Sequence, residues 1–305
     1  MFVSRVAVLG LIAVSLALPA AAREPVRLAP LGKWNLHYAE NSCQLMRQFG
    51  DAAKPLSLVI ERVNIGSGFS LLVIGGPLRA RVGYGTPTVA FTPLPADPTF
   101  VGAGTIAETV SKKETALFWS VLRLVPAVNL TTMPKASERP VRDLAVEAEA
   151  EALEKANAAS VTGLDISEPG GRRFFLTTGA LDKAFLLMRE CGRAKLADAG
   201  VDLAVHDRIV RPAFAKQSLA LLFRDSDYPS PAVFERSESV VTARLNIGAD
   251  GTVTRCTSLT RFKDPSFAKV VCRNLSKARF LPAELVDGTA VPDMVVTSVR
   301  FVMPD

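Results

Sequence analysis

The chain has 305 residues, of which 49% are hydrophobic and 22% are charged. This composition is sufficient to bury a core and excludes a mostly disordered chain, which would have fewer apolar residues and a higher net charge. The net charge of +6 comes from 36 basic and 30 acidic residues that are spread along the chain. A nucleic-acid-binding protein would concentrate its basic residues in one run or on one face, so we expect no nucleic-acid partner.

The first 22 residues are typical of a secretory signal peptide. Arg5 provides a positive charge, residues 6–18 form an apolar run, and Pro19 precedes three alanines that fit a signal-peptidase site. An uncleaved membrane anchor is the alternative, although the run is shorter than the ~20 residues that cross a bilayer. We expect residues 1–22 to be removed and the mature protein to be exported, without a membrane anchor.

Four cysteines in an exported protein predict disulfide bonds, because the compartments outside the cytoplasm are oxidising. Four cysteines allow three pairings. Cys256 and Cys272 lie 16 residues apart in one apparent module, so we expect them to pair with each other and Cys43 to pair with Cys191. Metal binding or a reactive thiol is the alternative, but no CxxC motif and no neighbouring histidine supports either one.

A β-rich α+β domain with one or two helices is predicted over residues 28–210. Its strands are indicated by alternating apolar residues between Gly and Pro turns, at residues 56–62, 69–74, 78–82, 88–92, 116–122 and 174–178. Residues 142–159 are rich in Ala, Glu and Leu and predict an exposed helix. A second helix follows Thr178, which can serve as its N-cap, and ends at Gly200. Its apolar face comprises Leu181, Ala184, Phe185, Met188 and Cys191.

A cluster of turn-forming residues at 225–231 (DSDYPSP) indicates a boundary between two domains. We expect a linker over residues 211–227 and a small second domain over residues 228–305. The predicted fold class of the whole chain is therefore α+β, with a β-rich N-terminal domain and a small ββαβ domain after it.

The elements of the second domain are indicated by local signals. Its first strand ends at Ile247, and a Gly-Ala-Asp-Gly turn leads into a second strand at residues 252–259. Asp264 and Pro265 predict the N-cap and the first position of a helix. The last strand is expected at residues 294–303. The apolar face of the helix comprises Phe267, Val270, Val271, Leu275 and Ala278.

Short motifs follow one another through this second domain. They are Tyr228-Pro229, Asp250-Gly251-x-Val253 and Phe280-x-Pro282-Ala283, followed by Gly288, Val291 and a terminal strand that reaches Phe301. Together these motifs resemble the C-terminal domain of the TonB energy-transducer family. The resemblance covers about the last 78 residues of the chain, and residues 28–210 resemble no module of known activity.

The resemblance implies a periplasmic recognition domain. TonB-like domains bind a short extended segment of an outer-membrane transporter by adding it to the edge of their sheet, beside the last strand. On this chain, the partner-binding edge is implied to comprise Val295, Thr297, Val299 and Phe301. Energy transducers also have an uncleaved membrane helix and a long Pro-rich spacer, which this chain replaces with a cleavable signal and a folded domain. We therefore expect a periplasmic protein that binds an envelope partner, with anchoring in the inner membrane as the alternative.

The sequence contains no recognisable catalytic constellation. His37 and His206 are too far apart in sequence for a metal-binding motif. Ser266 and Lys269 match a Ser-x-x-Lys pattern, but one such match is expected by chance. We therefore expect no enzymatic activity, no metal and no cofactor. The alternatives are a structural protein that binds peptidoglycan through its basic excess, or an envelope-acting enzyme with candidate polar groups Glu40, Asp51, Glu61 and Arg62.

Overall fold

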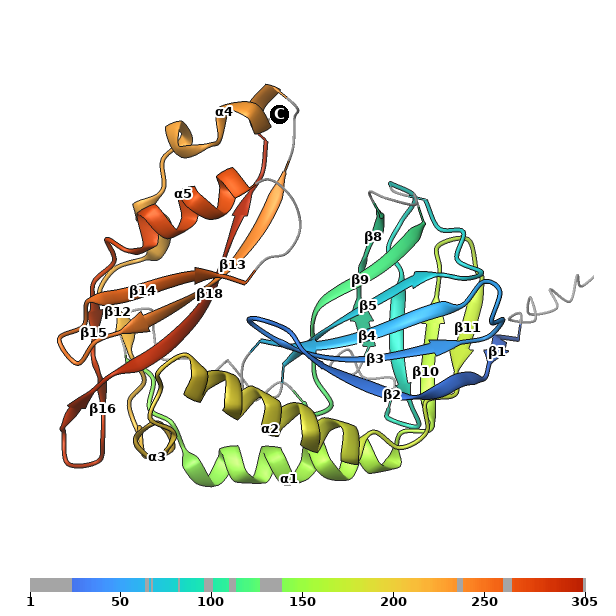
Figure 1. Ribbon diagram of the computed structural model, residues 1–305, viewed down its shortest axis with the longest axis horizontal. Coiled ribbons are helices and arrows are strands. Elements are labelled where there is room, and N and C mark those ends of the chain that lie inside the picture. Colours follow the sequence, from blue (N-terminus) through green and yellow to red (C-terminus); the bar gives the residue numbers. More distant parts are fainter. Residues whose placement is uncertain are drawn as a thin grey trace, which may run out of the picture.

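The chain folds into a strand-rich α+β structure, which confirms the predicted fold class (Figure 1). Two main hydrophobic cores organise it, one between Leu28 and Met188 and the other between Ala213 and Phe301. The predicted signal peptide lies outside the described residues. The computed structural model describes residues 24–63, 66, 68–81, 83–95, 101–109, 114–126, 139–234, 238–259 and 265–303.

The larger sheet of the N-terminal part is antiparallel. Its described strands are, in spatial order, β2 (Pro30–Tyr38), β3 (Cys43–Phe49), β4 (Leu56–Arg62), β5 (Phe69–Gly75), β9 (Thr115–Leu122) and β8 (Thr105–Glu108). In β4 every second side chain is buried, beginning with Leu56 and Leu58. This alternation is the pattern that predicts a strand with one face in a core, and it confirms the strands expected at 56–62, 69–74 and 116–122.

A second, mixed sheet packs against the same core. Its described strands are, in spatial order, β1 (Val26–Leu28), β11 (Arg173–Leu176), β10 (Gly163–Ser167), β6 (Thr88–Thr92) and β7 (Val101–Ala103). Phe69 of the larger sheet contacts Phe91 of the second sheet edge-on, with 5.8 Å between ring centroids. The two sheets therefore enclose a shared aromatic core. The strand expected at 88–92 is confirmed, and that at 174–178 is confirmed in part, since it ends at Leu176.

One predicted strand is wrong. Residues 78–81 of the expected strand at 78–82 form no strand, and Val82 lies outside the described residues. The segment follows a turn at Gly75 and Gly76, both of which have positive φ angles. The backbone N–H groups of Arg79 and Ala80 donate to the Glu168 carboxylate, at 2.8 and 2.7 Å, instead of to a neighbouring strand.

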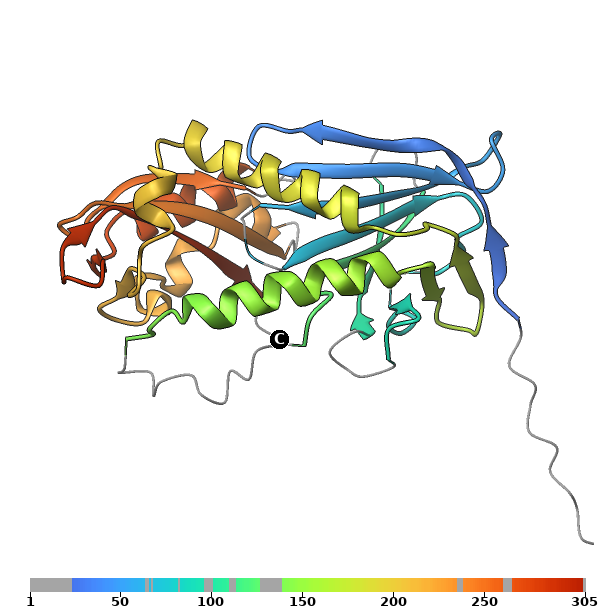
Figure 2. The same cartoon turned by 90° about the horizontal axis from the view of Figure 1, so that it is seen from below.

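Two long helices, α1 (Leu144–Ser160) and α2 (Asp182–Asp198), pack against each other along one side of the N-terminal sheets (Figure 2). The helix predicted at 142–159 is confirmed as α1. Its N-cap is Asp143, whose carboxylate accepts from the backbone N–H groups of Ala145 and Val146.

The predicted N-cap of the second helix is wrong. Helix α2 is preceded by Leu181 and has no side-chain cap. Thr178 lies four residues before Asp182, too early for an N-cap, and its hydroxyl donates to the carbonyl of Gly179. The end of the helix is as predicted, because Gly200 has a φ of 84°, which favours glycine. The predicted apolar face is also confirmed, since each of its members is buried: Leu181, Ala184, Phe185, Met188 and Cys191.

The segment 211–227, which was expected to be a linker, forms secondary structure and packs against the C-terminal part. Within it, β12 (Phe214–Ala215) pairs with β15 (Phe280–Leu281), and the side chains of Ala213, Leu219 and Phe223 pack into the second core. Its apolar residues are irregularly spaced, so no helix or strand period indicated their burial. The short elements between α2 and the C-terminal sheet are α3 (Leu203–His206), β12, the 3-10 helices η2 (Leu219–Leu222) and η3 (Asp225–Asp227), and α4 (Ser230–Phe234).

The C-terminal part has the predicted ββαβ order, formed by β13 (Ser239–Ile247), β14 (Val253–Ser258), α5 (Pro265–Leu275) and β18 (Asp293–Phe301). The spatial order of the strands is β14-β13-β18. Helix α5 packs on β13 and β14. The side chains predicted for its apolar face are all buried: Phe267, Val270, Val271, Leu275 and Ala278. Two further short strands, β16 (Ala283–Glu284) and β17 (Ala290–Val291), pair with each other, and Asp264 lies outside the described residues.

Candidate functional site

Strand β18 lies at one edge of the three-stranded sheet. It pairs with β13 in antiparallel register over all nine of its residues, from Asp293 opposite Ile247 to Phe301 opposite Ser239. Among the described residues, no strand pairs with its other side. A strand of this length extends for about 30 Å, which is long for an edge.

The hydrogen-bond pattern identifies which backbone groups of β18 are turned toward this unpaired edge. The N–H of Leu259 donates to the carbonyl of Thr242 at 2.8 Å. The backbone N–H and C=O groups of Thr242 are therefore directed toward β14. The N–H and C=O groups of successive residues point to opposite sides of a strand, so those of the odd-numbered residues of β13 are directed toward β18. Their partners Val295, Thr297 and Val299 therefore bond inward to β13. The residues whose backbone groups are directed outward are Met294, Val296, Ser298 and Arg300.

The four residues that the resemblance implies for partner binding have side chains that hold β18 in place. Val295 and Val299 pack against the second core, Thr297 is half-buried, and Phe301 is buried. The Phe301 ring lies 4.9 Å from that of Phe267 and 5.6 Å from that of Tyr228, between ring centroids. These residues thus stabilise the edge, whereas the exposed backbone groups belong to the intervening residues. In the sequence, only the alternation of apolar and polar residues along β13 indicated which residues of β18 bond inward and which have outward backbone groups.

Asp293 fixes the beginning of β18. Its carboxylate accepts from the N–H of Ala213 at 2.8 Å and lies 3.5 Å from Nδ1 of His206. Burial alone would raise the pKa of Asp293, but the His206 side chain and backbone donors, including Met294, outweigh burial and lower it. Beyond Met294, the outward N–H groups of β18 are those of Val296, Ser298 and Arg300, and none of the described residues pairs with them.

The opposite edge of the sheet is less suited to strand addition. Strand β14 has six residues, carries Arg255 in its middle, and is tied to α5 by the disulfide of Cys256. By contrast, residues 294–299 of β18 contain no charged residue and no proline. Charged residues and short length are the usual devices that prevent an edge from pairing. Strand β14 is short and carries a charge, whereas most of β18 is uncharged, so β18 is the edge that is better suited to pairing.

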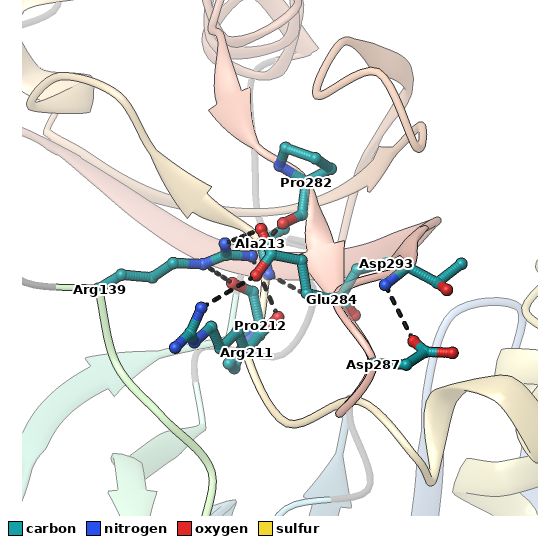
Figure 3. Close-up of polar contacts among 9 residues, drawn as sticks. Arg139, Arg211, Pro212, Ala213, Pro282, Glu284, Asp287 and Asp293 are labelled. Carbon is teal, nitrogen blue, oxygen red and sulfur yellow. Dashed lines mark hydrogen bonds and ion pairs between the residues drawn. The ribbon is translucent and has the colours of Figure 1, made fainter.

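Arg139 joins the start of α1 to the C-terminal part (Figure 3). Its guanidinium donates to the Glu284 carboxylate at 2.6 Å and to the carbonyls of Arg211, Pro212 and Pro282. Arg211 adds a second ion pair to Glu284, at 3.3 Å. Arg139 first, and Arg211 after it, lower the pKa of Glu284. This cluster holds the segment before Ala213 in place, and Ala213 in turn bonds the first residue of β18.

Both predicted disulfides are confirmed. Cys43 of β3 is bonded to Cys191 of α2, and Cys256 of β14 is bonded to Cys272 of α5. The first bond ties a sheet to a helix across 148 residues of sequence and is completely buried. The second links the helix of the C-terminal part to its sheet, and both of its cysteines are half-buried.

The polar groups considered for an enzyme do not form one site. Arg62 is not on the surface: it is fully buried and pairs with Glu154 of α1. Glu61, its neighbour, is directed to the other side of β4 and accepts from the Ser42 hydroxyl at 2.5 Å. Asp51 is exposed and accepts from a turn amide. Glu40 lines a cleft of about 550 Å³ between the β2–β3 turn and the end of β14.

The two histidines and the Ser-x-x-Lys pair are also separated. His37 is exposed on β2, and His206 ends α3 beside Asp293. Ser266 and Lys269 lie on α5. In the described part of the chain, no three His, Cys, Asp or Glu residues are grouped closely enough to hold a metal ion.

No family model, curated protein or solved structure matches this chain significantly. Across the residues described above, no helix is both long and apolar enough to cross a membrane.

Proposed function

We propose that this chain is an exported, non-catalytic binding protein of the periplasm that pairs with an extended segment of an envelope partner along β18. The observation that carries the proposal is the row of outward backbone groups at Val296, Ser298 and Arg300 on a long edge with few charges. An added strand would satisfy these groups and extend the sheet from three strands to four.

The resemblance to TonB C-terminal domains suggests the class of partner. It favours a short extended segment of an outer-membrane transporter, with affinity from backbone hydrogen bonds and selectivity from alternate side chains. The signal-like N-terminal sequence and the two disulfides support export to an oxidising compartment. A transducer's spacer is replaced here by a folded domain, so we propose recognition without transmission of force.

A proline at Ser298 tests this proposal. Ser298 is exposed, and its N–H is directed to the unpaired edge, so proline removes a donor there without breaking the β13 ladder. Val299→Pro would be a poor test, because the Val299 N–H bonds to β13 and its loss would damage the fold. The matched control is Ser298→Ala, which keeps the N–H and removes only the hydroxyl contact to Thr242 at 2.9 Å.

We expect tagged Ser298→Ala to recover the same envelope partner as the wild type in a pull-down. Ser298→Pro, with an unchanged circular dichroism spectrum and unfolding midpoint, should recover about tenfold less, because one hydrogen bond and the local ladder geometry are lost. Equal recovery by a folded Ser298→Pro variant would rule out strand addition at β18.

A further inference from the structure

The turn between β2 and β3 and the end of β14 enclose a cleft of about 550 Å³ (Figure 1). Tyr38, Glu40 and Asn41 line it from the turn, and Ser258 and Leu259 line it from β14. Sites for small molecules usually have volumes of roughly 300–1,000 Å³. The cleft therefore has the size of a ligand site, and its walls come from the N-terminal and the C-terminal parts of the chain.

The turn that lines the cleft is held firmly in place. Tyr38 and Cys43 form the last pair of the β2–β3 ladder, so the turn itself comprises only residues 39–42. A disulfide joins Cys43 to α2, and the Ser42 hydroxyl donates to the Glu61 carboxylate at 2.5 Å. A site that is already held in its binding geometry loses less conformational entropy when a ligand binds. The turn thus presents its exposed side chains in a preorganised arrangement.

Four polar side chains at the cleft have unused hydrogen-bonding groups. They belong to His37, Tyr38, Glu40 and Asn41. Tyr38 is 55% exposed although it lies at the end of a strand, and Glu40 is also exposed. Within the part of the chain that the structure describes, none of the four side chains forms a hydrogen bond or an ion pair. These groups are therefore available to a ligand that enters the cleft.

The lining favours a neutral ligand with several hydroxyl groups. Among the described residues that line the cleft, Glu40 carries a negative charge and none is a lysine or arginine, so an anion would be repelled. An organic cation would use Glu40 but would leave the donors of the Asn41 amide and the His37 imidazole without acceptors. The exposed Tyr38 ring also offers an apolar surface. A sugar ring satisfies all of these groups, because it combines an apolar C–H face with hydroxyls that both donate and accept.

We propose that this cleft binds a sugar ring of a neutral glycan, with Tyr38 stacked against the ring and with Glu40 and Asn41 bonded to its hydroxyl groups. A carboxylate can accept from two neighbouring hydroxyls at once, and such charge-assisted hydrogen bonds are stronger than neutral ones. Cleavage of a glycosidic bond requires a second carboxylate, which the described lining of the cleft lacks, so the role assigned to the cleft is binding alone. The cleft lies at the β14 edge of the C-terminal sheet, opposite β18, and does not depend on the proposed function.

The test is titration of the purified protein, with both disulfides formed, against glucose and N-acetylglucosamine, each as the free monosaccharide and as a linear trisaccharide. Calorimetry and saturation-transfer NMR measure binding, and glycerol is the reference, because it has hydroxyl groups but no ring. We expect saturable binding of at least one of these sugars, with a Kd of about 1 mM or below. Binding of a monosaccharide assigns a single ring as the ligand, and binding of a trisaccharide alone assigns a glycan chain. No saturable binding of any sugar beyond the glycerol reference overturns the proposal.

Substitutions locate the binding. Tyr38→Ala should weaken it by about tenfold or more, because the stacking surface is lost, whereas Tyr38→Phe keeps the ring and should retain the affinity within about threefold. Glu40→Gln should weaken it by about threefold to tenfold, because a charge-assisted hydrogen bond becomes a neutral one. Tyr84→Ala is the matched control, since Tyr84 is 71% exposed and does not line the cleft. It should change the affinity by less than about twofold.

Two outcomes would contradict this location. Equal losses in Tyr38→Ala and Tyr84→Ala would indicate adsorption of sugar to any exposed aromatic ring and not a site. Unchanged affinity in both Tyr38→Ala and Glu40→Gln would place the binding outside the cleft. Should Tyr38→Ala fail to fold, Glu40→Gln decides alone, because Glu40 is exposed, and unchanged sugar affinity in that variant would overturn the proposal.

Discussion

Arg62 shows how a charged residue can belong to a hydrophobic core. Its guanidinium lies 4.8 Å from the ring centroid of Phe185 and 5.9 Å from that of Phe69, and it is paired with Glu154. Glu154 is paired in turn with Arg189 of α2. Burial is the main cause that lowers the pKa of Arg62, and the Glu154 charge opposes it. The pairs join β4, α1 and α2, so their contribution is to fix the positions of these elements.

Removal of one member of a buried ion pair is expected to destabilise the fold more than removal of both, because the remaining charge stays buried without a partner. Glu154→Leu should lower the free energy of unfolding by about 3–5 kcal/mol, because Arg62 is left buried without its partner. The double variant Arg62→Met/Glu154→Leu should lose less than Glu154→Leu alone. Urea unfolding of the two variants measures both values. A double variant that is less stable than the single one would show that the charges contribute independently.

Asp293 gives the C-terminal part a defined dependence on pH. Burial opposes ionisation, but the contacts to His206 and to backbone donors prevail, so the folded-state pKa lies below the reference value of 3.8. A lowered pKa contributes stability that is complete above the unfolded-state pKa and is lost as pH falls through the folded-state pKa. Asp293→Asn should therefore cost about 1–3 kcal/mol at pH 7, and the difference from wild type should shrink below pH 3.8.

Unfolding curves between pH 3 and pH 7 check this prediction. Glu149→Gln is the control, since Glu149 is exposed on α1. A difference between wild type and Asp293→Asn that stayed constant down to pH 3 would show that the carboxylate charge is not responsible.

At the scale of elements, the two disulfides have different surroundings. Cys43 and Cys191 are completely buried between β3 and α2, whereas Cys256 and Cys272 are half-buried. A reductant needs access to sulfur, so the C-terminal bond should react first under native conditions. Alkylation followed by mass spectrometry, after mild reduction of the folded protein, identifies the bond that opens. Earlier opening of Cys43–Cys191 would contradict the described burial.

Loss of each disulfide should also have a different cost. On the loop-entropy model, Cys256→Ala/Cys272→Ala should cost about 3 kcal/mol and Cys43→Ala/Cys191→Ala about 5 kcal/mol, because the second bond closes a much longer loop. Denaturant titration of the two variants gives the values. A larger cost for the C-terminal pair would show that local packing outweighs loop length.

Elements could be predicted from the sequence where one local signal dominated. Strand β4 has strict alternation, α1 has strong helix formers, and α2 has a regular apolar face. Strand β3 was missed because Arg47 occupies an inward position of its alternation. Its guanidinium escapes burial by stacking over Trp34, at 5.4 Å, and by donating to the carbonyls of Gly32 and Thr178.

At the scale of the whole molecule, the decisive contacts join residues far apart in sequence. Arg139 and Glu284 are 145 residues apart, and Asp293 meets Ala213 across 80 residues. Such pairs leave no periodic signal in the sequence. The burial of segment 211–227 and the contacts that anchor the start of β18 could therefore not be predicted. The cysteines are the exception, because only three pairings exist and one is strongly favoured by proximity in sequence.

Strand β18 is proposed to offer alternate backbone donors to a partner strand, and residue-resolved amide hydrogen exchange measures this property at each N–H group. In the unbound protein, the N–H groups of Val296 and Ser298 should exchange at least about a hundredfold faster than those of Thr297 and Val299. In the complex recovered by pull-down, Val296 and Ser298 should become protected to the level of their neighbours. Uniform protection of β18 before binding, or no change at these two amides after binding, would contradict strand addition at this edge.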